Sequence, residues 1–414
     1  MKNGVLLFRS SLLFFISKNH IFADQMTSKK LNILFLPAWY PHRDDAMLGL
    51  FVKNHALSIL PYANVSVIYV LASDTNVSVY EVEKNDTDGI YEIIIYFKKC
   101  NTPIFGFFIN IIRMLLSYKK GWNILLEKRN KPDINHVHIL TRAGVIALIL
   151  KQLYKIPYVI TEHWSRYYSF NDSYNGILRK FMTKKVVKQA SAMSTVSDSL
   201  KNAMNQNGLI NKNWEIIPNS IDTDIFTPSI RDKKDSKTRI FHISCFEDKS
   251  KNVSGIIRAF ARASTENPNL ELIMIGAGQD HQKAIDLSNK LKLDNKIEFT
   301  GELSPKEVSQ KINSCDFQVL FSNYETFAIV IAESLAAGKA VIATNTGAIP
   351  EVLPKEFGLL IDAKDEDMLS KSILEMAKTH QKYDIEAMRN YAVSNYNKDK
   401  VGKQIIAFYK KYTS

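Results

Sequence analysis

The feature that most constrains the fold is a regular alternation of short apolar runs with longer segments of helical periodicity. Buried strands of a parallel sheet read as continuous apolar runs, and helices form the crossovers between them. The expected strands are residues 33–36, 65–70, 134–138, 158–161, 192–196 and 215–217, and then 240–244, 270–275, 296–300, 317–321, 340–344 and 358–361. Helical patterns lie between them, for example at 49–59, 144–154, 177–190 and 198–206. The alternation predicts two α/β domains, each doubly wound and Rossmann-like.

A linker separates the two series of strands. Residues 218–228 are rich in turn formers, and a charged run follows at 231–239. A chain of 414 residues is also too long for one hydrophobic core. We expect an extension outside the fold at 1–25, a first domain at 26–220, a second domain at 221–395 and a last helical segment at 396–414.

Net charge and cysteine content indicate which binding partners and which cellular compartment to expect for this chain. The net charge of +12 predicts an acidic partner, which could be nucleic acid, an anionic membrane or a phosphorylated substrate. No helix-turn-helix, RNP-like or zinc-finger pattern is present, so nucleic acid ranks below the other two. Cys100, Cys245 and Cys315 lack the spacing of a disulfide framework or a metal site. This usage favours a cytoplasmic protein.

The first 25 residues are expected to lie outside the folded domains. Their apolar run is interrupted by Arg9, Ser10 and Ser11, and it is too short to span a bilayer. Met26 lies just before the first expected strand and is a second plausible start. A weak helix on a membrane surface is the alternative interpretation.

Two carboxylates eight positions apart, Glu325 and Glu333, follow the expected strand at 317–321. Glu325 lies in the turn, and Glu333 lies in the next helix, which ends at Gly338. In an open parallel sheet, ligands bind where strands end, and a helix N-terminus there attracts phosphate. One carboxylate can meet a sugar and the other can accept hydrogen bonds from a ribose. The alternative is an amphipathic helix with two solvated glutamates.

Together with its context, YETFAIVIAESLAAGKAVIATNTGAIPEV at 324–352, this spacing resembles the E-x7-E signature of the retaining glycosyltransferases of family four, the glycosyl transferases group 1. The resemblance covers residues 32–412. It implies the GT-B fold, in which two Rossmann-like domains face a central cleft. The first domain would bind the acceptor and the second the nucleotide-sugar donor. The segment at 396–414 would cross back to the first domain.

The resemblance also assigns the groups that hold the donor. Glu333 would bind the ribose, and Phe327, Ala328 and Ile329 would offer main-chain N–H groups to the sugar or its phosphates. Many relatives have glycine where this chain has Ala328. If this position requires a positive φ, alanine is strained there.

Three glycines match donor-contacting positions of the family. Gly276 and Gly278 follow the strand at 270–275, and Gly49 lies in the first loop of the acceptor domain. Glycine would let the main chain approach the ligand closely at these points. Ordinary tight turns are the alternative.

Three side chains are the catalytic candidates. Lys251 matches the family's lysine, which neutralises charge on the departing diphosphate. His163 matches the histidine that reaches the transferred sugar, and Glu325 would position that sugar. The arginine that many relatives carry near Cys245 is missing, and Lys249 is a candidate substitute.

Other polar motifs have structural interpretations. His136 and His138, in the PDINHVH segment, match a strand of the family and could be core or rim residues. Asp222 and Asp224 spell the DxD metal motif of a different glycosyltransferase fold, but Asp222 also fits its GT-B counterpart. We therefore expect no metal and no cofactor other than the nucleotide-sugar substrate.

The segment at 105–118, FGFFINIIRMLLSY, is strongly apolar and is followed by Lys119 and Lys120. It could be an amphipathic helix on anionic lipid or a core helix of the first domain. A second basic helical patch lies at 179–188, and such a patch is more often merely solvated.

The chain is therefore expected to be a retaining, metal-independent hexosyltransferase that moves a sugar from a nucleotide diphosphate to a glycan or lipid-linked glycan in surface polysaccharide synthesis. It would be cytoplasmic, with peripheral membrane contact and no nucleic-acid partner. The alternatives are a GT-B epimerase or phosphorylase, a non-catalytic sugar-nucleotide-binding protein, and an inverting enzyme that uses Asp222 and Asp224 with a metal.

Overall fold

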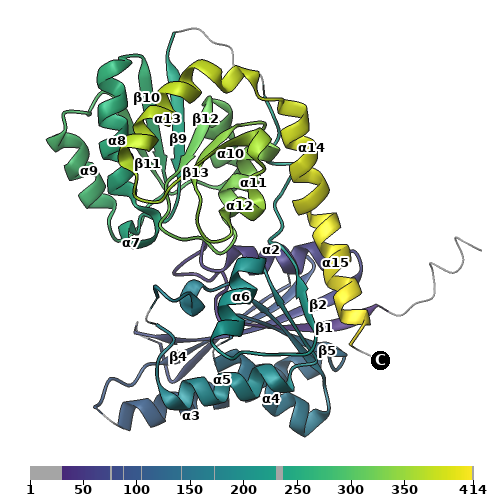
Figure 1. Ribbon diagram of the computed structural model, residues 1–414. Helices are drawn as coiled ribbons and strands as arrows, with labels where there is room; N and C mark the ends of the chain where they lie inside the picture. Colours follow the sequence, from purple (N-terminus) through teal and green to yellow (C-terminus); the bar gives the residue numbers. More distant parts are fainter. Residues whose placement is uncertain are drawn as a thin grey trace, which may run out of the picture.

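A computed structural model describes residues 30–412 except 75–76, 87, 104, 141, 172 and 230–235. The expected extension at 1–25 lies outside these residues, as does part of the charged linker. Two sheet-containing domains lie one above the other, and the C-terminal helices run along one side of both (Figure 1). No helix in the described ranges combines the length and apolar character needed to cross a bilayer.

The first domain is built on an eight-stranded sheet of order β3-β4-β2-β1-β5-β6-β7-β8. Its strands are β1 (Leu31–Pro37), β2 (Ala63–Ser73), β3 (Tyr80–Asn85), β4 (Ile90–Lys98), β5 (Ile134–His138), β6 (Tyr158–Glu162), β7 (Ala192–Thr195) and β8 (Trp214–Ile216). Its helices are α2 (Leu50–Ile59), α3 (Phe105–Lys128), α4 (Arg142–Tyr154), α5 (Ile177–Gln189) and α6 (Asp198–Gln206). Every pairing is parallel except β3 with β4.

The pair β3 and β4 was not predicted, although only β3 lacks an apolar run in its sequence. β3 is a polar edge strand whose residues are only partly buried, so its sequence lacks an apolar run. β4 is almost entirely buried and strongly apolar, and it pairs in parallel with β2. The first sheet is therefore larger than the alternation predicted, and it has one antiparallel edge.

The second domain has a six-stranded parallel sheet of order β11-β10-β9-β12-β13-β14. Its strands are β9 (Thr238–Ile243), β10 (Leu270–Ile275), β11 (Ile297–Gly301), β12 (Phe317–Leu320), β13 (Val341–Thr344) and β14 (Gly358–Ile361). Its helices are α7 (Asp248–Lys251), α8 (Val253–Glu266), α9 (His281–Lys290), α10 (Pro305–Asn313), α11 (Ile329–Ala336), α12 (Ile349–Val352) and α13 (Glu366–Thr379). All six predicted strands of this domain are present, and the predicted fold class is confirmed.

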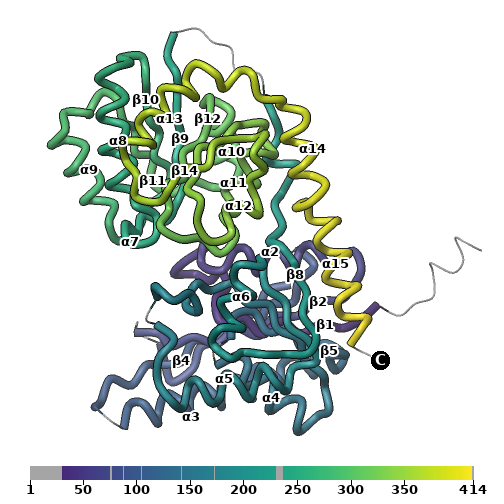
Figure 2. Tube along the Cα trace, viewed as in Figure 1, coloured from purple at the N-terminus to yellow at the C-terminus, as the bar shows by residue number. Residues whose placement is uncertain are grey.

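The end of the chain joins the two domains. Helix α14 (Ile385–Tyr396) packs on α11, and α15 (Lys398–Lys410) continues along the first domain (Figure 2). Gly402 in α15 lies against α2, where a Cβ would lie 2.0 Å from the carbonyl oxygen of Ser58. Tyr409 is buried and its hydroxyl lies 2.6 Å from Nδ1 of His136. The last helix is thus part of the first domain's core.

Candidate active site

The main candidate for a functional site is a cavity of about 650 Å³ between the carboxyl ends of the two sheets. In each sheet, the strand order reverses beside the first strand, which lies between strands that continue in opposite directions. Such switch points leave a crevice for ligands in open α/β sheets. Loops after β9 and β12 supply one wall of the cavity, and loops after β1 and β6 supply the opposite wall. The main lining residues are Trp39, Phe51, His163, Trp164, Asn219, Cys245, Lys249, Lys251, Tyr324, Glu325, Phe327, Ala328 and Ile329.

Lys251 and Glu325 form an ion pair in this cavity. Lys251 ends the short helix α7 after β9, and its Nζ lies 2.6 Å from Glu325 Oε1. Burial by itself would lower the pKa of Lys251, but the Glu325 carboxylate outweighs this effect and the pKa lies above its usual value. Lys251 is therefore a permanent cation next to a carboxylate, at the place where a diphosphate would enter.

The two loops that carry this pair are tied together. Asn323 donates from its backbone N–H to the carbonyl of Ser250 at 2.8 Å, and its side chain donates to the carbonyl of Lys249 at 3.0 Å. Ser322 donates to Glu325 Oε1 at 2.9 Å. Because each loop supports the other, the positions of the cation and the carboxylate are set before a ligand arrives.

Gly347, in the turn after β13, packs directly on Glu325. Its φ is +55°, and an added Cβ would lie 2.2 Å from the Glu325 carbonyl oxygen. The next residue, Ala348, donates its N–H to that same oxygen at 3.1 Å. Only glycine meets both conditions here, so this turn holds the backbone of the candidate catalytic glutamate.

Helix α11 begins at the cavity wall with Ala328 as its N-cap. Ala328 has φ 60° and ψ 58°, the left-handed conformation. Phe327, Ala328 and Ile329 all line the cavity, as the family pattern predicts. The first N–H groups of a helix have no intrahelical acceptor and attract anions. The helix start therefore faces the space where the donor's phosphates are expected.

Glu333 lies on the second turn of α11, behind the residues that line the cavity. Burial raises its pKa to about 8. Near neutral pH the carboxyl is therefore mostly protonated in the empty protein. Hydrogen-bond donors such as ribose hydroxyls would favour the ionised form. The proposed ribose contact of Glu333 stays a prediction.

His163 faces the cavity from the first domain, just after β6. Its ring packs against Phe51, and its Nε2 lies 3.1 Å from Nδ1 of His138. Burial, together with nearby imidazoles, lowers the pKa of His163 well below its usual range. A neutral ring is favoured, so a hydrogen bond to a sugar is a better role for it than charge on a phosphate. His138 is fully buried behind His163, where it can act only through that ring.

Ring nitrogens of His55, His138 and His163 lie within 4.8 Å of one another, close enough to hold a metal ion. Burial lowers the pKa of each ring, so all three favour the neutral form that binds metals. The hydrogen bond between His138 and His163 uses one proton and one lone pair. Each neutral ring has one N–H. Of the two nitrogens outside this hydrogen bond, Nε2 of His138 and Nδ1 of His163, only one therefore keeps a lone pair that could bind a metal. The hydrogen-bonded arrangement therefore suits positioning of His163 better than three-histidine metal binding.

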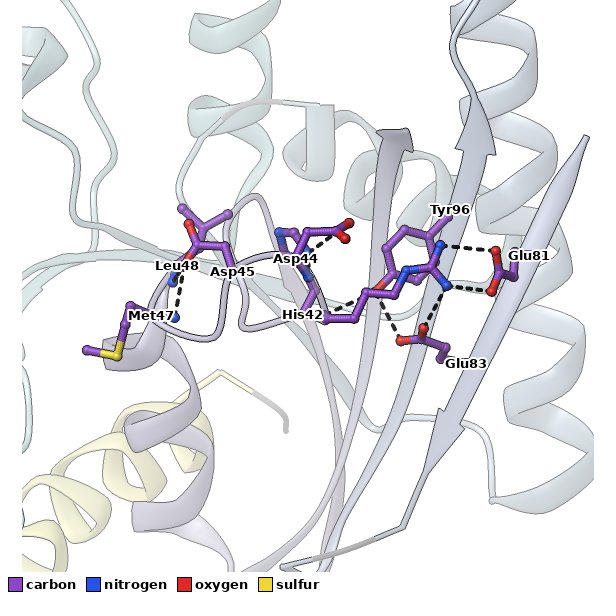
Figure 3. Close-up of polar contacts among 9 residues, drawn as sticks. His42, Asp44, Asp45, Met47, Leu48, Glu81, Glu83 and Tyr96 are labelled. Atoms are coloured by element: carbon purple, nitrogen blue, oxygen red, sulfur yellow. Dashed lines mark hydrogen bonds and ion pairs between the residues drawn. The ribbon is translucent and has the colours of Figure 1, made fainter. Parts of the chain in front are cut away.

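The loop between β1 and α2 is anchored to the edge of the first sheet (Figure 3). Arg43 donates to Glu81 at 3.0 Å and to Glu83 at 3.1 Å, both on β3. Its guanidinium lies 4.0 Å above the ring of Tyr96, whose hydroxyl donates to Glu83. The unpredicted strand β3 thus holds the loop that leads to the cavity.

Gly49 ends this loop as the N-cap of α2, with φ +68°. A Cβ at this position would lie 2.4 Å from the carbonyl oxygen of Trp39. The glycine therefore lets the loop pack on Trp39, while Trp39 and Phe51 line the cavity and Gly49 does not. The predicted contact of Gly49 with the donor stays a prediction.

Gly276 and Gly278 pack on the loop after β9. Added Cβ atoms would lie 2.0 Å from the carbonyl oxygen of Ser244 and 2.6 Å from the nitrogen of Phe246. Both glycines have positive φ. They support the wall from behind and are not among the residues that line the cavity.

Sequence reasoning missed several lining residues. Trp39 and Trp164 lie with ring centroids 4.8 Å apart, and Tyr324 lines the cavity next to Glu325 in the chain. Aromatic residues in loops carry no periodic signal, although their positions after β1, β6 and β12 could have marked them. The missing arginine has no replacement by another arginine among the described lining residues, where Lys249 is the second cation.

Asp222 has a structural role. Its Oδ1 accepts from the N–H groups of Asp224 and Ile225, at 3.1 and 3.2 Å, and its Oδ2 pairs with Lys398. It thus links the segment between the domains to α15. The GT-B interpretation of this residue fits these contacts better than a DxD metal site does.

Direct contacts hold the two domains together around the cavity. The Tyr168 hydroxyl donates to the carbonyl of Glu325 at 3.3 Å, and Ser197 donates to the carbonyl of Thr326 at 2.8 Å. Glu351 accepts at 2.8 Å from two N–H groups at the start of α6. The backbone of the candidate catalytic turn is therefore held from both domains.

Comparison with known proteins agrees with this arrangement. The family model described as Glycosyltransferase Family 4 matches residues 67–225, and the model described as Glycosyl transferases group 1 matches residues 226–394. The two matches are contiguous.

Two curated relatives illustrate the range of similar proteins. The chain is 27% identical over 270 residues to the N-acetyl-alpha-D-glucosaminyl L-malate synthase of Bacillus anthracis, covering 62% of this chain and 68% of that one. It is 26% identical to the N-acetylgalactosamine-N,N'-diacetylbacillosaminyl-diphospho-undecaprenol 4-alpha-N-acetylgalactosaminyltransferase of Campylobacter jejuni, covering 81% of this chain and 92% of that one.

Among solved structures, Anabaena HepE in complex with UDP-glucose is similar in fold. The TM-score is 0.69 at 18% sequence identity, covering 92% of this chain and 100% of that one.

Proposed function

Because the chain belongs to the group 1 glycosyltransferases and has their GT-B fold, we propose that it is a retaining, metal-independent hexosyltransferase. Its donor would be a nucleotide-diphosphate sugar, and its acceptor a glycan or lipid-linked glycan of a surface polysaccharide. The observation that carries the proposal is the Lys251–Glu325 pair, held at the switch point of the donor domain and facing His163 across the cavity.

Each residue has a role that its position supports. The donor's diphosphate would compete with Glu325 for Lys251 and bind near the start of α11. As the bond from the sugar to the diphosphate breaks, negative charge grows on the leaving oxygen, and the Lys251 ammonium stabilises it. The released carboxylate of Glu325 would face the sugar, and neutral His163 would donate a hydrogen bond to it. Lys249 would supply the second cation.

The acceptor class follows from the relatives and from the surface of the first domain. The name of the Campylobacter jejuni relative identifies its acceptor as a diphospho-undecaprenol-linked sugar. In the present chain, α3 and α5 expose apolar side chains, with Phe105 72% and Ile177 91% exposed. We call this set the apolar surface: Phe105, Phe107, Phe108, Ile111, Ile112, Leu115 and Leu116 on α3, and Ile177, Leu178 and Phe181 on α5.

Both sequence interpretations of residues 105–118 find support, because Met114 and Tyr118 are buried on the opposite side of α3. Exposed basic residues accompany the apolar surface, namely Lys119 and Lys120 on α3 and Lys180, Lys184, Lys185 and Lys188 on α5. This combination suits the interface of an anionic bilayer. We therefore propose that the enzyme works at the cytoplasmic face of a membrane, in peripheral contact with it.

The donor and the chemistry are tested together. A thermal-shift screen of UDP, GDP and ADP sugars should identify the ligand that raises the melting temperature, since a ligand that binds only the native state stabilises it. Transfer from that donor is then assayed with a chelator present throughout, and NMR reports the anomer of the product. Turnover that needs added metal, an inverted product, or epimerised donor without transfer would each reject part of the proposal.

Membrane contact has its own test. The wild-type protein should sediment with vesicles of phosphatidylglycerol and phosphatidylcholine. The double variant Phe108→Glu, Leu115→Glu should stay in the supernatant. Met368→Glu on α13, which is also exposed, is the matched control. A dimer that the double variant dissociates, with no binding to vesicles, would instead show that a second copy covers the apolar surface.

A further inference from the structure

A second cavity, of about 470 Å³, lies in the first domain beside the 650 Å³ cavity described above. Its walls come from α3, α4 and α5 and from the loops after β1 and β6. Trp39 and Trp164 line both cavities, so this pair of rings separates them. A ligand in the second cavity would lie one aromatic layer away from Glu325 and His163.

The second cavity is strongly basic. Arg142, Arg166 and Arg179 line it, and none of its described lining residues is acidic. We call it the arginine pocket. Arg142 and Arg179 are exposed at its mouth, and Arg179 donates to the carbonyl of Ser173. No ion pair within 4 Å connects these three arginines to a carboxylate among the residues that the structure describes.

Arg166 is the informative member because it is buried and, among the described residues, no carboxylate pairs with it. Its residue is only 8% exposed, its guanidinium lies 3.3 Å above the ring of Trp164, and its Nε has no hydrogen-bond acceptor. The Glu162 carboxylate also attracts Arg166, but it accepts its hydrogen bonds from the N–H groups of Leu140, His163 and Trp164. Burying an unpaired cation costs free energy, and an anionic ligand in the pocket would recover it.

Most of the remaining wall of the pocket is apolar, although Tyr118 and Thr183 also line it. Val70, Met114, Val145, Met182 and Val186 line it. Met114 belongs to α3 and Met182 to α5, the two helices that carry the apolar surface. The pocket therefore offers three cations next to an apolar wall and opens among helices suited to lipid. This combination matches an amphiphile with an anionic head.

We propose that the arginine pocket binds the diphosphate of a lipid-linked acceptor. This inference rests on the proposed function and deepens it by naming the acceptor's charged group and its residues. Arginine suits this role because its planar fork can form two hydrogen bonds to phosphate oxygens. The diphosphate would sit on Arg142, Arg166 and Arg179 with the lipid along α3 and α5. The acceptor's sugar would then extend past the tryptophan pair toward the donor.

The test uses farnesyl diphosphate, a soluble diphosphate with a short isoprenoid tail. Calorimetry should detect its binding to the wild-type chain, with weaker binding of inorganic pyrophosphate and of farnesol. Arg166→Gln, Arg142→Gln and Arg179→Gln should each weaken it about tenfold or more, as expected for loss of a charge-assisted hydrogen bond. Lys290→Gln removes an exposed charge from α9 in the second domain, outside the pocket, and should change little.

A donor-site variant separates the two proposals. Lys251→Ala should weaken nucleotide binding and leave farnesyl diphosphate binding intact, whereas Arg166→Gln should do the reverse. If Arg166→Gln lowers the melting temperature, Arg142→Gln replaces it in this comparison, because Arg142 is exposed and its substitution should not disturb the fold. Full binding by all three arginine variants, or loss of binding in Lys251→Ala, would overturn the inference. Pyrophosphate binding as tight as farnesyl diphosphate would assign the pocket to a free phosphate ligand and overturn it as well.

Discussion

Ala328 occupies a backbone conformation that alanine adopts reluctantly. A left-handed non-glycine residue costs on the order of 1–2 kcal/mol, yet the turn needs this conformation to aim the start of α11 into the cavity. Ala328→Gly should therefore raise the free energy of unfolding by up to about 1 kcal/mol after the flexibility of glycine is counted. Urea denaturation measures the change.

Ala332→Gly is the matched control, because Ala332 lies inside the same helix. There glycine should destabilise the protein by about 1 kcal/mol. If both variants were equally destabilised, the strain assigned to position 328 would be absent.

The Lys251–Glu325 pair is expected to serve turnover more than folding. Glu325→Gln keeps the shape of the side chain and removes its charge, and Lys251→Ala removes the cation near the leaving diphosphate. Each should lower kcat by about 100-fold or more. The transfer rate under saturating donor is the measurement, with Lys251→Arg expected to recover only part of it. Near-normal rates in both variants would place the chemistry elsewhere.

Glu333 should make nucleotide binding depend on pH. With a pKa of about 8 in the empty protein, its carboxyl must lose a proton before it can accept hydrogen bonds fully as a carboxylate. Affinity should therefore rise with pH, by up to about fivefold between pH 7 and pH 8, because the ionised fraction of a group with this pKa grows by about that factor. Calorimetry at both pH values tests this, and Glu333→Gln should abolish the dependence. A pH-independent affinity in the wild-type chain would argue against ribose contact by this residue.

At the scale of elements, the turn after β13 controls the catalytic turn after β12. Gly347→Ala forces a Cβ against the carbonyl of Glu325 and should cost activity as well as stability. Gly301→Ala is the matched control, because Gly301 also has a positive φ but an added Cβ would meet nothing within 4 Å. It should lose about 1–2 kcal/mol of stability and keep its transfer rate. Equal activity in the two variants would contradict the coupling between these turns.

At the scale of the whole molecule, buried histidines should make the fold sensitive to acid. Burial lowers the pKa of His55, His136, His138, His163 and His242. Below the unfolded pKa of about 6.5, the unfolded chain binds these protons and the native protein does not. Stability should fall as pH decreases, by about 1.4 kcal/mol per pH unit for each proton of difference.

Two buried carboxyls act in the opposite direction. The pKa values of Glu162 and Glu333 are raised, so these groups favour the native state as pH falls. Because the five histidines outnumber them, the melting temperature should decrease between about pH 7 and pH 5. Calorimetric scans check this, and an unchanged or higher melting temperature at pH 5 would show that the histidines are protonated in the native protein.

The local sequence pattern was sufficient to predict an element where the pattern lies entirely within that element. Strands such as β13 and β14 are largely apolar runs bounded by turn residues, so their existence follows from the sequence. The spacing of Glu325 and Glu333 is also local, since both belong to one turn and helix. Strand β3 was not predicted because an edge strand buries little of its side-chain surface and needs no apolar run.

The sequence by itself determined the two α/β domains, their order and the residue types at the ends of their strands, because burial in a parallel sheet leaves a periodic record. Only the tertiary structure decided which of these ends meet. Lys251 contacts Glu325 because β9 and β12 are neighbours across a switch point. Arg166 is a buried cation because three helices and two tryptophans surround it. Neither burial nor contact across the chain has a local signal, so the site's electrostatics exist only in the folded molecule.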